Sequence, residues 1–371
     1  MRKFISLLIS LFFLFIALPS ASAEYSVVRI TSTLHQNFSG EFVNDELVQE
    51  LTPSGKLGQL VFTPSMKSKI WVIDAALIDE VLAMTGDYTL VGGAVPSGKE
   101  ISLSWLTQLR KITADNDVVA LAYGNPDVAV AKRLAPSELR AYFSYGKTVL
   151  EMVLGRPVRS EPSQHWSVGT SKLSSDLSRS YGDVRKDLTR LSRVVTSPDL
   201  VKLRMSLGRL LSPSLDFEDR TAFSFNARSA VDAEVHKLRI VPGKYQLTTE
   251  TASLPVTVIN DFPVEVTVNI RMVAGNARII VDSFTGVTLP PSSKLQLELN
   301  AFVIAPGQTV VLGQMTDAAG NYVVPPTTLA LNATVIDPRV TWFTTGAAIL
   351  LLLAAVAQSV RRIRKGRQSE I

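Results

Sequence analysis

Hydrophobic residues recur at two different spacings along the chain, and the change of spacing divides it into regions. In residues 24–160, short apolar runs alternate with segments of helical spacing. The run at residues 70–73 ends at Asp74, and apolar positions then recur three and four residues apart from Ala76 to Leu82. Such a run followed by this spacing predicts a buried strand and then a helix.

A second unit of the same kind follows. Residues 104–112 have helical spacing, residues 118–123 form another buried-strand run, and Asn125-Pro126-Asp127 precedes a further helix. Pro126 is expected at the first position of that helix. Alternation of strand and helix is typical of an α/β region with a parallel or mixed sheet. The region is too short for an eightfold barrel, which needs about 250 residues.

Residues 161–238 are expected to be helical. Apolar positions spaced by three and four form a stripe in its first half, namely Leu177, Tyr181, Val184, Leu188, Leu191 and Val195. A second stripe is formed by Leu203, Leu207, Leu210 and Leu211, and a third helix is predicted at residues 219–238. Such stripes can grip a partner helix, but an intramolecular core is the favoured interpretation.

The pattern changes to strict alternation in residues 239–337. Val264, Val266, Val268 and Ile270 are one example, and Leu295, Leu297 and Leu299 are another. Turn-forming pairs such as Asn260-Asp261 and Pro290-Pro291 interrupt the alternation at short intervals. About 95 residues of short strands with this spacing predict an immunoglobulin-like β-sandwich without the cysteine pair of antibody domains. The predicted fold class is therefore α+β and multidomain.

Both ends of the chain carry long apolar runs. Arg2 and Lys3 precede the run at residues 4–18, and Ala21-Ser22-Ala23 then matches a cleavage site, so residues 1–23 are predicted to be a signal peptide rather than an uncleaved anchor. Residues 340–360 contain no charge and would span roughly 30 Å as a helix. Because the basic tail at residues 361–371 follows directly, a transmembrane helix is favoured over a buried core helix.

The distribution of charge supports this topology and bears on possible partners. The net charge is +5, of which residues 1–23 carry +2 and residues 361–371 carry +4, leaving about −1 for the rest. The charge thus follows membrane topology and gives no reason to expect nucleic-acid binding. We expect a single-pass type I protein of the cell membrane, with its bulk outside the cytoplasm and the lipid bilayer as a partner.

The residue types exclude several kinds of site. With no cysteine, the chain has no thiolate ligand, thiol nucleophile or disulfide. His35, His165 and His236 lie far apart in sequence and outside any HxxxH or HExxH motif. No nucleophile elbow, P-loop or dinucleotide fingerprint occurs either. The sequence predicts no metal site and no cofactor.

Two aspartates are the only candidates for catalysis. Asp74 and Asp127 each follow a predicted strand, where catalytic groups of α/β proteins often lie, and a carboxylate pair can act as the acid and base of a glycosidase. Asp also caps helices, because its carboxylate accepts the free amides of the first turn. Capping is the favoured interpretation.

Several stretches resemble an uncharacterised family of actinobacterial envelope proteins. They are residues 71–77 (WVIDAAL), Trp105-Leu106, residues 119–128 (VALAYGNPDV) and residues 254–261 (LPVTVIND). The resemblance implies a signal peptide, an α/β region, a sandwich and one C-terminal anchor. Genes of the family commonly neighbour that of the lipid II flippase, which implies a link to peptidoglycan assembly. This chain departs from the family at Ala75, where proline is common, and at Asn125, where an acidic residue is common. Its α/β region is also shorter.

These observations predict a non-enzymatic binding or scaffolding protein of the cell envelope, linked to cell-wall assembly through proteins or polysaccharide. The alternative is a degenerate or unrecognised carbohydrate-active enzyme that uses Asp74 and Asp127. A sensor is disfavoured because eleven cytoplasmic residues cannot form a signalling domain.

Overall fold

The structure is a computed structural model that describes residues 26–64, 69–161, 166–334 and 338–367. The chain forms two compact units. The first comprises residues up to 173 together with 208–220, and the second comprises residues 174–207 together with those from 221 onward. The predicted signal peptide at residues 1–23 and His165 lie outside the described residues.

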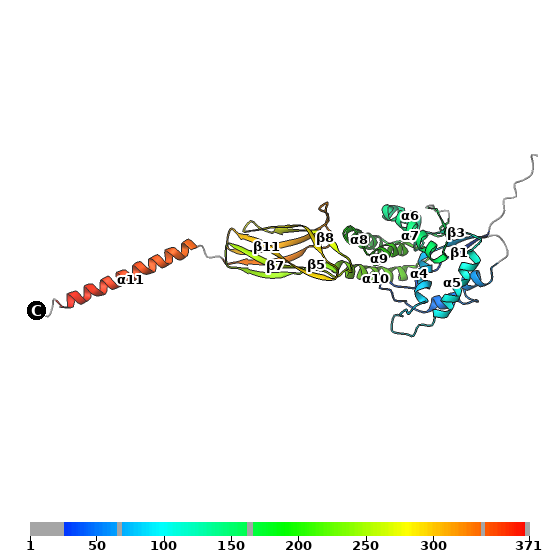
Figure 1. Cartoon of the computed structure of the whole chain (residues 1–371), viewed down its shortest axis with the longest axis horizontal. Helices are drawn as coiled ribbons and strands as arrows, with labels where there is room; N and C mark the ends of the chain where they lie inside the picture. Colours follow the sequence, from blue (N-terminus) through cyan, green and yellow to red (C-terminus); the bar gives the residue numbers. More distant parts are fainter. Residues whose placement is uncertain (1–25, 65–68, 162–165, 335–337, 368–371) are drawn as a thin grey trace, which may run out of the picture. The chain divides into compact units, whose positions relative to one another are not determined.

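The first unit is built on a parallel sheet. Its strands are β1 (Ser26–Ile30), β2 (Lys69–Ile73), β3 (Asp117–Ala120) and β4 (Arg159–Ser160), adjacent in sequence order and all parallel. Figure 1 labels strands β1 and β3 of this sheet. Two helices occupy each connection. They are α2 (Glu46–Leu51) and α3 (Lys56–Phe62), then α4 (Ala75–Met84) and α5 (Lys99–Thr113), then α6 (Val128–Leu134) and α7 (Pro136–Leu154). The predicted alternation of strand and helix is therefore present.

Tryptophan side chains are buried in the first unit, close to its helices and its sheet. Trp105 of α5 is fully buried, and its indole nitrogen donates a 3.1 Å hydrogen bond to the Leu57 carbonyl of α3. Trp166 packs with Val72, Val119 and Leu121. Because Val72 and Val119 are register partners on neighbouring strands, their side chains share one face of the sheet, and Trp166 covers it.

Local details differ from the sequence-based expectation. Pro126 precedes the helix, because Asp127 is the N-cap and α6 begins at Val128. The second leucine stripe is split between α9 (Pro198–Ser206) and the 3₁₀ helix η1 (Leu207–Leu211). The third helix, α10 (Phe217–His236), ends before Leu238, which opens a strand. The expected helical region at residues 161–238 is divided between the two units, and residues 166–174 contain no helix.

The helical part of the second unit contacts its strands through an ion pair next to α8. Helix α8 (Ser175–Leu191) buries Leu177, Tyr181, Val184, Leu188 and Leu191, the stripe expected to form core. Ser174 caps this helix by accepting a hydrogen bond from the Leu177 amide. Just beyond α8, Arg193 lies 3.5 Å from the carboxylate of Asp317 in a turn between strands.

Residues 238–333, which we call the β region, form two sheets. One has the order β5 (Leu238–Ile240), β7 (Thr251–Asn260), β11 (Ser293–Val303) and β9 (Ile279–Val281). The other has the order β10 (Phe284–Leu289), β8 (Val266–Ala274), β12 (Gly307–Thr316), β13 (Thr327–Ala333) and β6 (Gly243–Leu247). Pairing is antiparallel except between β13 and β6. Buried and exposed positions alternate along β8 and β12, as the sequence pattern predicted.

One fully buried polar side chain joins the two sheets. Asn260, at the end of β7, donates hydrogen bonds to the carbonyls of Val264, Leu289 and Pro290 and accepts one from the Phe262 amide. Leu289 is the last residue of β10 in the other sheet. The Asn260-Asp261 turn signal therefore marks a buried connection as well as a change of direction.

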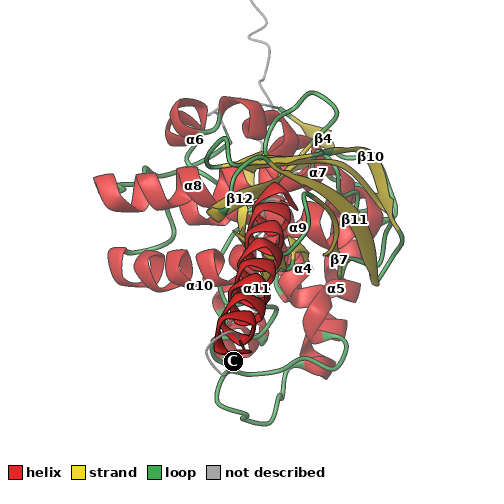
Figure 2. Ribbon diagram, turned by 90° about the vertical axis from the view of Figure 1, so that its left-hand side faces the viewer, coloured by secondary structure: helices red, strands yellow, loops and turns green. Residues whose placement is uncertain are grey.

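The last described element is α11 (Pro338–Arg367), drawn as one continuous helix in Figure 2. Its stretch Thr344–Arg361 is long and apolar enough to cross a membrane, and none of it is buried by the rest of the chain. The helix extends through the basic residues that were expected to lie beyond the membrane segment.

Candidate functional site

The two aspartates predicted as candidates lie where their strands end. Asp74 follows β2, and its Oδ1 accepts hydrogen bonds from the amides of Ala76 at 3.0 Å and Gly124 at 2.9 Å. The first bond caps α4, and the second fastens the turn that follows β3. Gly124 has a φ of +80°, and a Cβ there would lie 2.4 Å from Cγ of Arg209. Only glycine fits this close approach.

Burial dominates the electrostatics of Asp74. The residue is 5% exposed, and loss of hydration raises the pKa of its carboxyl group to about 6, although its amide donors and the Arg209 charge act in the opposite direction. Near it, Glu80 of α4 forms a buried ion pair with Arg209 and accepts hydrogen bonds from the amides of His35 and Gln36. Although burial disfavours the charged form of Arg209, the Glu80 carboxylate raises its pKa.

Asp127 has a comparable role in the next turn. Its Oδ1 accepts hydrogen bonds from the amides of Ala129 and Val130 at the start of α6, and its Oδ2 accepts one from the Ser171 amide at 2.7 Å. The amide of Asp127 itself donates to the Leu211 carbonyl. Both carboxylate oxygens are therefore used to hold three segments of the first unit together.

The edge of the parallel sheet thus brings Asp74 together with Glu80 and Arg209, two residues that sequence reasoning missed, whereas Asp127 does not line the space beside them. A charged residue within the apolar stripe that contains Leu207, Leu210 and Leu211 was the available signal for Arg209. The space beside Asp74 and Arg209 has a volume of only about 10 Å³. That is about the room one water needs, so this arrangement holds no sugar ring.

The histidines do not gather at this edge. His35 is buried, and its ring lies 3.3 Å from the Ser32 hydroxyl, whereas His236 is exposed at the end of α10. Across residues 26–64, 69–161, 166–334 and 338–367, no group of three or more metal-binding side chains is found.

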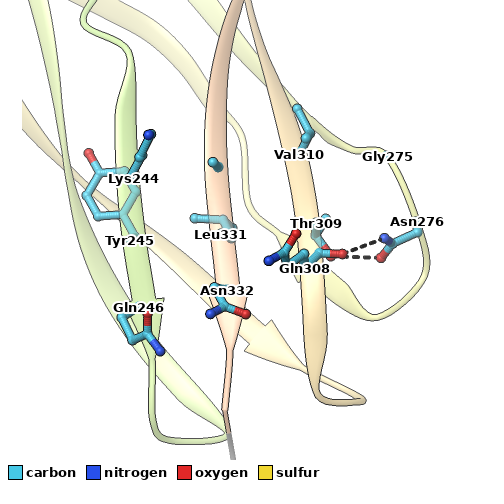
Figure 3. A pocket seen from close by; sticks show the side chains of 11 residues that line it. Lys244, Tyr245, Gln246, Gly275, Asn276, Gln308, Thr309, Val310, Leu331 and Asn332 are labelled. Atoms are coloured by element: carbon cyan, nitrogen blue, oxygen red, sulfur yellow. Dashed lines mark hydrogen bonds between the residues drawn. The ribbon is translucent and has the colours of Figure 1, made fainter.

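A larger concavity lies on the β region (Figure 3). It has a volume of about 610 Å³ and lies over β6, β12 and β13, with the turn after β8 at its side. The lining comprises Lys244, Tyr245, Gln246, Gly275, Asn276, Gln308, Thr309, Val310, Ala330, Leu331 and Asn332. No acidic residue belongs to it.

Strand register arranges the outward side chains of this concavity in two rows. Gln246, Asn332 and Gln308 are consecutive register partners across β6, β13 and β12, and form a row of three amides. Figure 3 shows Asn332 between the other two. Lys244, Ala330 and Val310 form the second row.

The three amides of the first row are available for a ligand. Among the described residues, the side chains of Gln246, Asn332 and Gln308 have no hydrogen-bond partner. Asn276 is different, since its Nδ2 donates to the Gln308 carbonyl and its Oδ1 accepts from the Thr309 hydroxyl, as drawn in Figure 3. The turn after β8 is thereby fixed beside the row.

Comparisons with known proteins add a family. A search of curated proteins finds no significant match. Among solved structures, the chain is similar to WR4, an MSP family member of C. elegans, with 13% identity over 26% of this chain and 98% of that one, at a TM-score of 0.22. It is also similar to the CARDB domain of PF1109 from Pyrococcus furiosus, with 16% identity over 26% of this chain and 94% of that one, at a TM-score of 0.21. The model of a family of unknown function (DUF6049) matches residues 93–368, well over half of the chain, which therefore belongs to this family.

Proposed function

We propose that this protein is a membrane-anchored binding protein that holds a component of the cell envelope outside the cytoplasm. The observation that carries the proposal is the concavity of about 610 Å³ with its row of unpartnered amides. Small-molecule sites generally occupy about 300–1,000 Å³ and contain a few polar groups that fix orientation. The predicted carboxylates, by contrast, serve as helix caps, and the space beside Asp74 has a volume of only about 10 Å³.

The proposed topology combines the two ends of the chain. Residues 1–23 act as a cleaved signal peptide, α11 spans the bilayer, and the basic residues from Arg361 onward remain in the cytoplasm. The β region is then an immunoglobulin-like sandwich next to the membrane. Four residues separate the last strand residue, Ala333, from Pro338, so that the end of β13 lies within about 20 Å of the helix start.

The resemblance to actinobacterial envelope proteins suggests cell-wall assembly as the setting. Candidate occupants of the concavity are a polysaccharide, a lipid-linked precursor or another envelope protein. Nucleic acid is not among them, because the part of the chain between the two charged ends has a net charge of only about −1.

Photo-crosslinking in intact cells tests this function. Gln308, in the concavity, is replaced by p-benzoylphenylalanine in one strain, and Gln296, an exposed amide on β11 of the other sheet, is replaced in a control strain. We expect an adduct of higher mass after irradiation from position 308 and not from position 296. Equal adducts from both positions, or none from either, would contradict a binding function at the concavity.

The second candidate is a carbohydrate-active enzyme, and the raised pKa of Asp74, about 6, is the observation that favours it. In an enzyme, Asp74→Asn and Asp127→Asn abolish glycoside cleavage while the fold persists. In a binding protein, both variants retain ligand binding and change stability alone, because asparagine also caps helices.

A further inference from the structure

We propose that the concavity over β6, β12 and β13 binds a short, uncharged oligosaccharide. This inference rests on the proposed binding function and specifies its ligand.

The amide row matches the hydrogen-bonding character of sugars. Each amide of Gln246, Asn332 and Gln308 offers both donors and an acceptor, and each sugar hydroxyl also donates and accepts. The register places the three amides side by side on neighbouring strands, which lie about 4.8 Å apart. A row of this kind can therefore contact successive hydroxyls of one chain of sugar units.

The second row supplies a surface for the less polar faces of sugar rings. Ala330 is exposed, and Val310 beside it is 50% exposed, so small apolar groups lie next to the amides. The outward positions of β11 in the other sheet differ, because Lys294 and Glu298 bring charges there. The concavity is therefore not the ordinary charged outer face of a sheet.

Charge argues for an uncharged ligand. The only ionised side chain of the lining at neutral pH is Lys244, an exposed residue at one end of the second row. A site for a strongly anionic ligand usually brings several cationic groups together. The amides at the centre of the concavity carry no charge.

One wall of the site is already in place without a ligand. The turn after β8 is held on β12 by the two hydrogen bonds of Asn276, at 3.1 Å and 2.8 Å, and by the bond from the Gly275 amide to the Val310 carbonyl, at 2.8 Å. A wall fixed in advance reduces the ordering that binding requires. Weak neutral contacts can then suffice for measurable affinity.

The test measures binding of maltotriose, cellotriose and triacetylchitotriose to the full chain by saturation-transfer NMR and calorimetry. The detergent must lack a sugar headgroup, because a maltoside or glucoside would compete for the same site. Two variants address the site in different ways. Gln246→Ala with Gln308→Ala removes two amides, and Ala330→Met fills the floor beside them. Gln296→Ala on β11 is the matched control, because it removes an exposed amide from the other sheet.

We expect at least one trisaccharide to bind, the double variant to bind about tenfold more weakly or worse, and Gln296→Ala to bind as the parent does. Ala330→Met should also lose binding, because its longer side chain fills the floor beside the amides. Absence of binding by all three sugars overturns the proposal. An adduct from position 308 in cells without sugar binding would preserve the binding function and discard the oligosaccharide.

Discussion

At the scale of single residues, the residue type of a buried polar group predicts its local role, such as helix capping, but not its contacts with distant segments. Asp74 caps a helix, as aspartate often does, but it also reaches Gly124 fifty positions later. Arg209 forms an ion pair with Glu80, although the two residues lie 129 positions apart in sequence. The Asp74 carboxyl group therefore lies in a largely buried site, where ionisation is costly.

The raised pKa of Asp74 predicts a pH dependence of stability. The native carboxyl group has a pKa of about 6, against an ordinary value of 3.8, so between these pH values the native state binds the proton more tightly than the unfolded chain does. The cost is absent below about pH 3.8 and complete above about pH 6, and the free energy of unfolding falls as pH rises through this window. The shift corresponds to about 3 kcal/mol.

Denaturant unfolding of the parent and of Asp74→Asn across this pH range measures that cost. Asparagine keeps a capping oxygen without the titration, so the stability of the parent relative to the variant should fall by about 3 kcal/mol from below pH 4 to above pH 6. A constant difference between the two proteins over the range would show that Asp74 does not titrate there.

Asn260 supports a second prediction at this scale. Replacing it with alanine leaves the Leu289 carbonyl and the Phe262 amide without this partner, whereas the Pro290 carbonyl still accepts a hydrogen bond from the Ser293 hydroxyl. Each unsatisfied buried group costs about 1–3 kcal/mol, so we expect Asn260→Ala to lower the free energy of unfolding by at least about 2 kcal/mol. Gln296→Ala, on the exposed face of β11, should remain within about 0.5 kcal/mol of the parent in the same denaturation experiment.

At the scale of elements, a single glycine determines how closely α7 packs against the sheet. Gly146 lies within α7, and a Cβ there would be 2.6 Å from the Leu121 carbonyl oxygen and 3.1 Å from the Tyr123 amide nitrogen. Both atoms belong to the backbone that follows β3, so neither can rotate away. Glycine therefore allows α7 to lie directly against the end of β3, beside the turn that Asp74 fastens.

Alanine substitutions at two helical glycines, one packed against the strand and one in open space, test this packing. Gly146→Ala must displace α7 from the strand and should destabilise the protein by about 1–3 kcal/mol. Gly182→Ala, within α8, meets no atom within 4 Å among the described residues and should stabilise by about 0.5–1 kcal/mol through helix propensity. Thermal melts of the two variants should shift in opposite directions, and equal shifts would refute the packing argument.

At the scale of the whole molecule, α11 is the one described helix that is long and apolar enough to cross a membrane. Leu350, Leu351, Leu352 and Leu353 are each more than half exposed, whereas the apolar residues of α8 are buried. Exposure of this apolar surface to water would be unfavourable along the whole length of the apolar stretch. A bilayer removes it from water, which is the physical basis for proposing a membrane anchor.

Alkaline carbonate extraction of cell membranes tests the anchor. The parent should remain in the membrane pellet. Leu351→Asp with Leu352→Asp places two charges near the middle of the span, at a cost of about 2.5–3.5 kcal/mol each, and should move the protein to the supernatant. Leu351→Ile with Leu352→Ile is the control that keeps the apolar character. Release of the parent and of this control by carbonate would exclude α11 as an anchor.

The strands, the membrane-length helix and the helix caps could be predicted from local patterns in the sequence. The alternation in residues 239–337 predicted strands because side-chain direction in a strand has a period of two, and the uncharged run before Arg361 predicted a membrane-length helix from its apolar composition. Asp74 and Asp127 were recognised as helix caps because a cap interacts with amides only two or three residues away. Each of these features depends on neighbours in sequence.

Tertiary structure decided the rest, because it depends on which distant segments become neighbours. The register of β6, β13 and β12 brings Gln246, Asn332 and Gln308 into one row, although they lie far apart along the chain. No periodicity encodes that register. The desolvation that raises the pKa of Asp74 likewise requires the segment of Arg209 to close over the sheet edge. The strands, the helix caps and the apolar helix could therefore be predicted from the sequence. The amide row and the buried charges could not, because they arise only from packing between remote parts of the chain.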